Sequence, residues 1–166
     1  MAKKKSNNVY ELKVKLKYRK KIWRLIAIGG DQTLADLHNA IFEAFDRYDD
    51  HLYSFYVLAP GAKGRRRREG AIEFTDPFNN EEVGSSYDSV FNAEETTIDE
   101  LNLEKGQLLK YLFDFGDEWE HEISVVRIEE LTDKRKYPII LKKEGDSPPQ
   151  YPDCDDEYDD EEDESD

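Results

Sequence analysis

The chain has 166 residues, of which 38% are charged, and it carries a formal net charge of −15. This length predicts one domain with tails. The single cysteine, Cys154, excludes a disulfide framework and a zinc-finger cysteine pattern, and no apolar run approaches the ~20 residues of a membrane span.

The charge is unevenly distributed along the chain. Residues 153–166 hold eleven acidic residues and no basic one, which leaves 28 acids and 24 bases elsewhere. We predict a disordered basic N-terminus over residues 1–8, and a Pro-rich exit with a disordered acidic tail over residues 146–166, because such segments have too few apolar residues to fold alone. The N-terminus lacks the apolar stretch of a secretory signal. These features favour a soluble cytoplasmic protein.

Alternating residues near the N-terminus predict a β-hairpin. Apolar residues from Tyr10 to Tyr18 alternate with Glu11 and three lysines, which is the pattern of a half-buried strand. Residues 19–21 should turn the chain. Residues 22–28 then form a second strand that pairs with the first.

A helix is predicted after the glycine-rich break at residues 29–31. Thr33 begins it, and Asp36 follows three residues later in the arrangement of a capping box. Apolar residues and one histidine then recur at helical spacing, and they are Leu34, Leu37, His38, Ile41, Phe42 and Phe45. We expect the helix to end near residues 45–48 and a third strand to cover residues 51–57.

The middle of the chain has weaker patterns. Residues 59–70 contain the four consecutive arginines Arg65, Arg66, Arg67 and Arg68, and we expect a mobile basic loop there. Residues 71–75 predict a short edge strand. Thr97 and Glu100 have the spacing of a second capping box, before a short helix over residues 98–103.

Residues 113–121 combine three large aromatic residues, four acidic residues, a glycine and a histidine. Matching the apolar faces of the flanking segments predicts a hairpin in which Phe115 pairs with Trp119 across a loop of residues 116–118. This register places Asp114 opposite Glu120. We favour an ion pair of these carboxylates with Arg24 over a catalytic carboxylate pair. A last strand is expected over residues 138–141.

These elements predict an α+β domain over residues 9–145. It consists of a single mixed, largely antiparallel sheet with one main helix packed on a face. The expected order is β-grasp-like, β-β-α-β followed by a C-terminal β-hairpin. Aromatic residues on strands usually lie in the core, so Trp23 and Trp119 are predicted to be core or core-edge residues.

The histidines and nearby carboxylates define a candidate metal site. Imidazole and carboxylate groups together bind zinc and similar divalent metals. The candidate ligands are His38, His51, His121, Asp114 and Asp117, with Glu120 and Glu122 close in sequence. The alternative, which we favour, is that His38 and His121 each form a hydrogen bond inside the core and that no cofactor is bound.

Two basic segments define a candidate nucleic-acid surface. Lys13, Lys15 and Lys17 lie on one exposed strand face, and the four arginines 65–68 could also contact phosphates. Lysines on exposed strands also protect against edge-to-edge aggregation. The acidic tail could cover this basic face, in which case deletion of residues 153–166 would strengthen salt-sensitive binding of DNA or RNA.

Four blocks in this order, residues 22–24, 33–41, 51–55 and 111–121, resemble the plasmid pRiA4b ORF-3-like family, whose small domains are often found on plasmids and mobile elements. The resemblance covers roughly residues 9–145. It implies a compact α+β domain of uncharacterised biochemistry, and no catalytic residue is carried over. Some members are labelled resolvase-like. Such members continue from a Pro-Pro-Glu-Asp stretch into a further helix, whereas here Pro148-Pro149-Gln150-Tyr151 leads directly into the acidic tail.

The motifs of common enzymes are absent from the sequence. It has no Gly-rich phosphate loop and no Gly-x-Ser-x-Gly elbow. Cys154 lies among acids that disfavour a thiolate, and no serine has the arginine-rich setting of a recombinase nucleophile. We therefore predict a non-enzymatic binding or adaptor module with a protein partner and no membrane association. The alternatives are a nucleic-acid-associated accessory protein and a metal-dependent enzyme at the hairpin.

Overall fold

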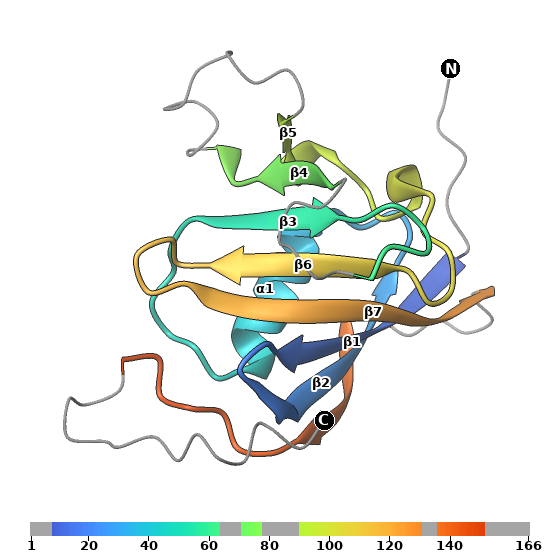
Figure 1. Ribbon diagram of the computed structural model, residues 1–166. Coiled ribbons are helices and arrows are strands. Elements are labelled where there is room, and N and C mark those ends of the chain that lie inside the picture. Colours follow the sequence, from blue (N-terminus) through green and yellow to red (C-terminus); the bar gives the residue numbers. More distant parts are fainter. Residues whose placement is uncertain (1–7, 64–70, 78–89, 131–135, 152–166) are drawn as a thin grey trace.

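The computed structural model describes residues 8–63, 71–77, 90–130 and 136–151. The predictions for residues 1–7, for the arginines 65–68 and for the acidic tail from residue 152 lie outside these ranges. The described strands form one 8-stranded sheet, and helix α1 packs against one of its faces (Figure 1). No helix within the described ranges is long and apolar enough to cross a membrane.

The strands follow the chain as β1 (Asn8–Leu16), β2 (Arg19–Gly29), β3 (Tyr53–Val57), β4 (Ile72–Thr75), β5 (Val90–Asn92), β6 (Leu108–Phe113), β7 (Trp119–Glu130) and β8 (Ile139–Glu144). Helix α1 spans Leu34–Ala44, and the 3₁₀ helices η2 and η3 span Ala93–Glu95 and Asp99–Leu101.

The sheet has the order β5-β4-β3-β6-β7-β1-β2-β8. The β4–β5 pair is parallel, and the other neighbouring strands pair antiparallel. The predicted α+β class and the mixed, largely antiparallel sheet are therefore confirmed. The β-grasp-like order is not confirmed by this topology.

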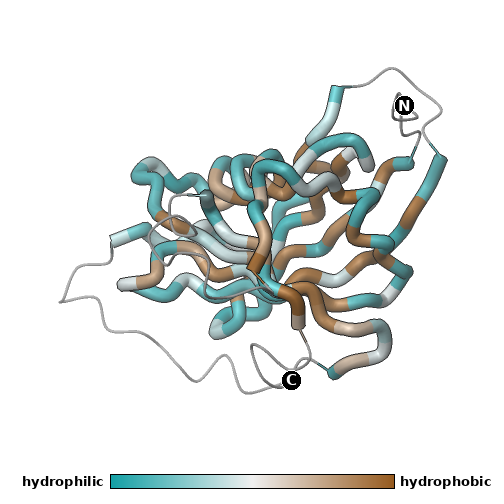
Figure 2. The backbone as a smooth tube through the Cα atoms, turned by 90° about the horizontal axis from the view of Figure 1, so that it is seen from above, coloured by the Kyte–Doolittle hydropathy of each residue, from teal (hydrophilic) through white to brown (hydrophobic). Residues whose placement is uncertain are grey.

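The β1–β2 hairpin forms because its alternating residues divide between two environments. Tyr10, Leu12, Val14 and Leu16 are buried in the core, whereas Glu11 and the three lysines point to the opposite face and are half-buried. The turn lies at residues 17–18, two residues before the predicted one, because Arg19 already belongs to β2. Figure 2 shows hydrophobic residues along the central strands and hydrophilic ones in the outer loops.

Helix α1 begins at the predicted capping box. The Thr33 hydroxyl accepts from the Asp36 amide, and the Asp36 carboxylate accepts from the Thr33 amide. The predicted stripe lies against the sheet, with Leu34, Leu37 and Ile41 fully buried. The second capping box is also present, between Thr97 and Glu100 at the start of the short η3 helix.

The predicted register of the β6–β7 hairpin is wrong by two residues. Phe113, not Phe115, pairs with Trp119, and Glu120 lies opposite Leu112. The reason is local: Asp114 adopts a left-handed φ of 66° and its carboxylate accepts from the amides of Gly116 and Asp117. These bonds make a five-residue loop over 114–118, which removes Asp114 from the strand.

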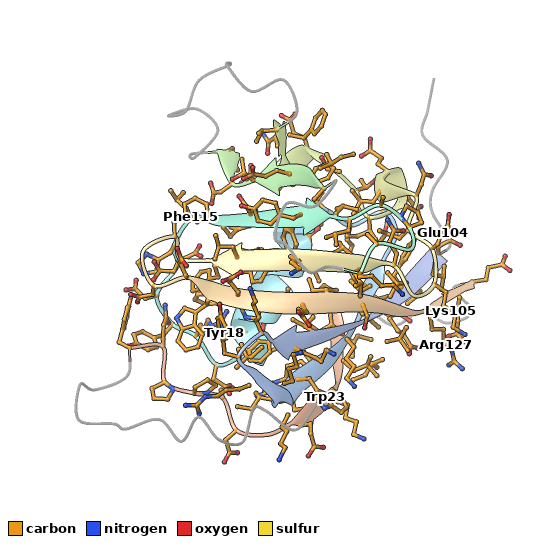
Figure 3. All side chains as sticks on the ribbon, in the orientation of Figure 1. Tyr18, Trp23, Glu104, Lys105, Phe115 and Arg127 are labelled. Atoms are coloured by element: carbon orange, nitrogen blue, oxygen red, sulfur yellow. The ribbon has the colours of Figure 1, made fainter. Side chains whose placement is uncertain are left out.

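Two further predictions about strands need correction. β4 is not an edge strand, because the unpredicted strand β5 lies outside it. Trp23 is not a core residue: it lies on the face of the sheet away from α1, half-buried under the ammonium group of Lys13, whose Nζ is 4.4 Å from its ring centre (Figure 3). Trp119 packs against the core as predicted.

Candidate functional site

Four segments that are distant in sequence meet at one end of the sheet (Figure 1). They are the β1–β2 turn, the 114–118 loop, the connection from α1 to β3, and the segment that follows β8. In Figure 3, Tyr18 and Phe115 lie toward this end, and Glu104, Lys105 and Arg127 lie at the other. We call this region the hairpin end. Of the predicted site residues, His51, Asp114 and Asp117 lie at the hairpin end, and His38 and His121 are buried in the core.

His38 connects helix α1 to strand β6. Its Nε2 lies 3.0 Å from Asp50 Oδ1, and its Nδ1 lies 2.6 Å from the Tyr111 hydroxyl. Because a carboxylate can only accept, Nε2 carries a proton, and in the neutral imidazole Nδ1 accepts from the Tyr111 hydroxyl. The imidazole also stacks on the ring of Tyr53, with 3.9 Å between the ring centres. His38 is therefore held in the core through both of its ring nitrogens.

His121 lies on the other side of the same tyrosine and contacts a buried arginine. Arg47 Nη2 donates to His121 Nε2 over 2.9 Å, and His121 Nδ1 donates to the Tyr111 carbonyl over 3.2 Å. Since an arginine cannot accept, the imidazole must be neutral in this arrangement. The rings of Tyr111 and His121 are 4.9 Å apart.

The pKa values of these buried groups are displaced from their ordinary range. Burial lowers the pKa of His38, and burial with the nearby Arg47 charge lowers the pKa of His121 well below 6.5. Burial raises the pKa of Tyr111 well above 10. Each shift disfavours the charged form of its group. The side chains of His38, His121 and Tyr111 are therefore neutral, and Arg47 is the charged group beside them.

Arg47 is a buried cation that the sequence analysis missed. Its side chain is enclosed by the rings of Phe45, Phe113 and Trp119, each with its centre 5.1–5.2 Å from Cζ. Burial lowers its pKa to about 10. Asp46 precedes it with a left-handed φ of 56°, which turns the chain after α1. No sequence signal distinguishes this arginine from a solvent-exposed one.

His51 belongs to a separate, partly exposed cluster. The Tyr151 hydroxyl donates to Asp49 Oδ2 over 2.7 Å, so His51 Nε2 must donate to the Tyr151 oxygen, 2.6 Å away. Asp114 Oδ2 and Asp49 Oδ2 lie 3.5 and 3.7 Å from the same nitrogen. Of the predicted site residues, His51 and Asp114 therefore lie together.

The described residues do not assemble the predicted metal site. His38 contacts the hydroxyl of Tyr111, whereas His121 contacts its carbonyl. Both nitrogens of each ring have hydrogen-bond partners within the protein. Asp117 is exposed in the loop. Within the described ranges, no three His, Cys, Asp or Glu side chains are placed to hold a metal ion.

Arg24 does not neutralise the hairpin carboxylates, contrary to the prediction. It is 1% exposed and lies beside Phe45 on the helix side of the sheet. Its guanidinium donates to the carbonyls of Ala44, Trp23 and Glu144, and to the hydroxyl of Ser147. Arg24 thus joins β2, the end of α1 and the segment that follows β8.

The segment that follows β8 is tied to the end of α1. Gln150 is 4% exposed. Its Oε1 accepts from the amides of Tyr48 and Asp49, and its Nε2 donates to the Asp49 carbonyl. The Ser147 hydroxyl donates to Asp46. The predicted Pro-rich exit is therefore packed against the domain as far as residue 151.

Lys13, Lys15 and Lys17, the predicted nucleic-acid contacts, lie among carboxylates on the face of the sheet away from α1. Lys17 Nζ is 3.4 Å from Glu120 Oε1, and Lys15 lies opposite Glu122 in the β1–β7 pair. Lys13 covers Trp23. These contacts intersperse negative charges along the row, so the three lysines do not form a uniformly basic patch.

Asp114 gives a test of the hairpin loop. Asp114→Ala should lower the free energy of unfolding by about 1–2 kcal/mol, because two loop amides lose their acceptor and alanine is disfavoured at positive φ. Asp114→Asn keeps an acceptor oxygen and tolerates this backbone, so it should cost less than half as much. Urea unfolding of both variants checks this, and equal losses would contradict the account.

Comparison with known proteins adds family and fold. The family model of the plasmid pRiA4b ORF-3-like proteins matches residues 8–161. The crystal structure of the protein of unknown function MM3350 from Methanosarcina mazei Go1 is similar, with a TM-score of 0.65 and 24% identity over 86% of this chain and 72% of that chain. At this identity the likeness concerns the fold alone. No curated protein matches the sequence.

The family match covers nearly the whole chain, including every block from which the resemblance was inferred. The same blocks supply His38, Tyr111 and His121 to the buried cluster and Asp114 to the loop. The protein belongs to the plasmid pRiA4b ORF-3-like family, a family of uncharacterised proteins.

Proposed function

We propose that this protein is a non-enzymatic binding module that contacts a protein partner through the hairpin end. The observation that carries the proposal is a set of exposed tyrosines there. Tyr18, Tyr48 and Tyr151 are 61%, 71% and 41% exposed. We call these three residues the tyrosine surface. Tyrosine is enriched at protein interfaces, where its ring supplies contact area and its hydroxyl a hydrogen bond.

Two residues of the tyrosine surface, Tyr48 and Tyr151, are held in place by contacts with their neighbours. Tyr48 and Tyr151 pack edge to face, with 5.9 Å between their ring centres. The neighbouring Gln150 is buried and fixes the backbone of Tyr48. Rings held in this way lose little conformational entropy on binding, which favours a stable contact.

Carboxylates around these rings favour a partner segment with positive charge. Tyr151 donates to Asp49 over 2.7 Å, and Tyr18 donates over 3.3 Å to Glu120, which is already paired with Lys17. The contact with Asp49 raises the pKa of the Tyr151 hydroxyl to about 12, so it stays protonated at neutral pH. Aromatic faces beside carboxylates suit lysine or arginine side chains.

Selection from a random peptide library tests the proposal. The full chain should enrich peptides that combine Lys or Arg with aromatic residues. A peptide selected in this way should bind Tyr48→Ser at least ~10-fold more weakly, a loss of about 1.4 kcal/mol. Dissociation constants from fluorescence anisotropy at two salt concentrations give the readout.

Phe91→Ser is the matched control, because Phe91 is a 46% exposed aromatic residue on the distant edge strand β5. It should bind the same peptide with wild-type affinity. Enrichment of no peptide, or equal binding by wild type and Tyr48→Ser, would reject the tyrosine surface as the binding site.

The other two predicted functions have less support. The nucleic-acid alternative rests on lysines that are interspersed with glutamates, and on arginines outside the described residues. The metal-dependent enzyme rests on histidines whose nitrogens are engaged by Tyr111, Asp50 and Arg47.

A further inference from the structure

Two buried hydrogen-bond donors in the core next to the hairpin end have no acceptor among the described residues. Arg47 Nη1 and Trp119 Nε1 are both inaccessible to solvent, and neither has a hydrogen-bond partner within the part of the chain that the structure describes. Arg47 is 8% exposed, and its Cζ lies 5.1 Å from the centre of the Trp119 ring, so the two donors belong to side chains in direct contact. Buried donors are nearly always paired in folded proteins, which makes two neighbouring exceptions informative.

The charge of Arg47 also has no counter-charge from the residues that the structure describes. Among the described residues it has no carboxylate within ion-pair distance, and its one side-chain hydrogen bond goes to the neutral imidazole of His121. Arg24, the other buried arginine, differs, because four oxygens accept from its guanidinium. A buried guanidinium favours a site where an anion can reach it.

We propose that Arg47 and Trp119 form a binding site for a carboxylate group. One carboxylate oxygen would accept from Arg47 Nη1 and the other from Trp119 Nε1, since a carboxylate presents two acceptor oxygens in one plane. Trp119 is half-buried although its N–H is covered, so part of this side chain lies at the surface. The inference is independent of the protein-binding role proposed above.

The donor set favours a carboxylate over other occupants. A water molecule would satisfy a donor but leave the cation uncompensated. A phosphate has more acceptor oxygens than the two free donors can serve, and its larger charge would need further cations. A cation is excluded by the guanidinium itself. The carboxylate could come from a small organic acid or from a glutamate side chain of a peptide, and the chemistry of the site is the same.

Proton–nitrogen NMR of the full chain tests the site, because the molecule contains its own references. The chain has two tryptophans, so the indole N–H signal of Trp119 can be compared with that of Trp23. The guanidinium N–H signals of Arg47 can be compared with those of Arg24. Sodium acetate is titrated against sodium chloride at matched ionic strength. A second arm uses an acetylated, amidated peptide with one glutamate, and a third uses its glutamine counterpart.

With acetate, the Trp119 and Arg47 signals should shift together and saturate, whereas those of Trp23 and Arg24 should stay in place. Trp119→Phe keeps an aromatic ring over Arg47 but removes the N–H, and it should weaken acetate binding at least tenfold. Arg47→Lys should abolish the saturable shift of Trp119.

The peptide arms identify the source of the carboxylate. A saturable shift with the glutamate peptide, and none with its glutamine counterpart, would assign the carboxylate to a peptide. A saturable shift with acetate only would assign it to a small organic acid.

Three results would overturn the proposal. The first is the absence of a saturable shift at either signal in every arm. The second is an equal shift with chloride, which would indicate screening alone. The third is wild-type acetate affinity in a folded Trp119→Phe variant, which would place the anion elsewhere.

Discussion

Replacing Arg24 with methionine should lower the free energy of unfolding by about 3–5 kcal/mol, because it removes several hydrogen bonds from a charged donor that are each worth about 1.5–3 kcal/mol. The guanidinium satisfies the carbonyls of Ala44, Trp23 and Glu144 and the Ser147 hydroxyl, at 2.8–2.9 Å. Methionine fills much of the volume but cannot donate to any of these four oxygens. Urea unfolding followed by circular dichroism gives the measurement.

Two further variants test whether this loss comes from the buried hydrogen bonds of Arg24. Arg127→Met removes an arginine whose side chain is 59% exposed and whose ion pairs are on the surface, so it should cost less than about 1 kcal/mol. Arg24→Lys keeps the charge but cannot reproduce the planar set of donors, so its stability should lie between Arg24→Met and wild type. A loss below about 1 kcal/mol in Arg24→Met would show that the network is dispensable.

Acidification should destabilise the fold through its two buried neutral histidines. The folded-state pKa of His38 and of His121 is lowered by burial from an unfolded value near 6.5. Their contribution is therefore complete above pH 6.5 and is lost as the pH falls toward the folded-state pKa, because the unfolded chain binds protons first. Each histidine can add at most ~1.4 kcal/mol per pH unit to the slope.

Glutamine variants separate this effect from the many carboxylates. His121→Gln retains one acceptor for Arg47 and one donor for the Tyr111 carbonyl, but it does not titrate. The free energy of unfolding of His121→Gln should fall less steeply than that of wild type between pH 6.5 and pH 5. The double variant with His38→Gln should be flatter still. Slopes equal to wild type would mean that these histidines are not neutral in the folded protein.

Most of the elements were predictable because they depend on residues close in sequence. The alternation from Tyr10 to Leu16, and the capping boxes at Thr33 and Thr97, specify backbone hydrogen bonds and faces without reference to the rest of the chain. The α+β class follows from the order of these elements. The family was also predictable, since the motifs that define it are linear.

The hairpin register shows where local patterns become ambiguous. Phe113 and Phe115 have the same parity, so either satisfies the apolar face opposite Trp119. The choice is made by Asp114, whose positive φ and bonds to two loop amides end the strand early. Many strands end at an aspartate, so the sequence does not show that Asp114 ends β6 in this way.

The sequence by itself determined the α+β class, most of the strands, and the main helix with its capping box. Only the tertiary structure decided the partners of the buried polar groups: Arg24 with the end of α1, Arg47 with His121, and Gln150 with the loop after α1. The physical reason is range. Periodicity and caps act within a few residues, whereas these bonds join segments 20–102 residues apart and exist only once the sheet has formed.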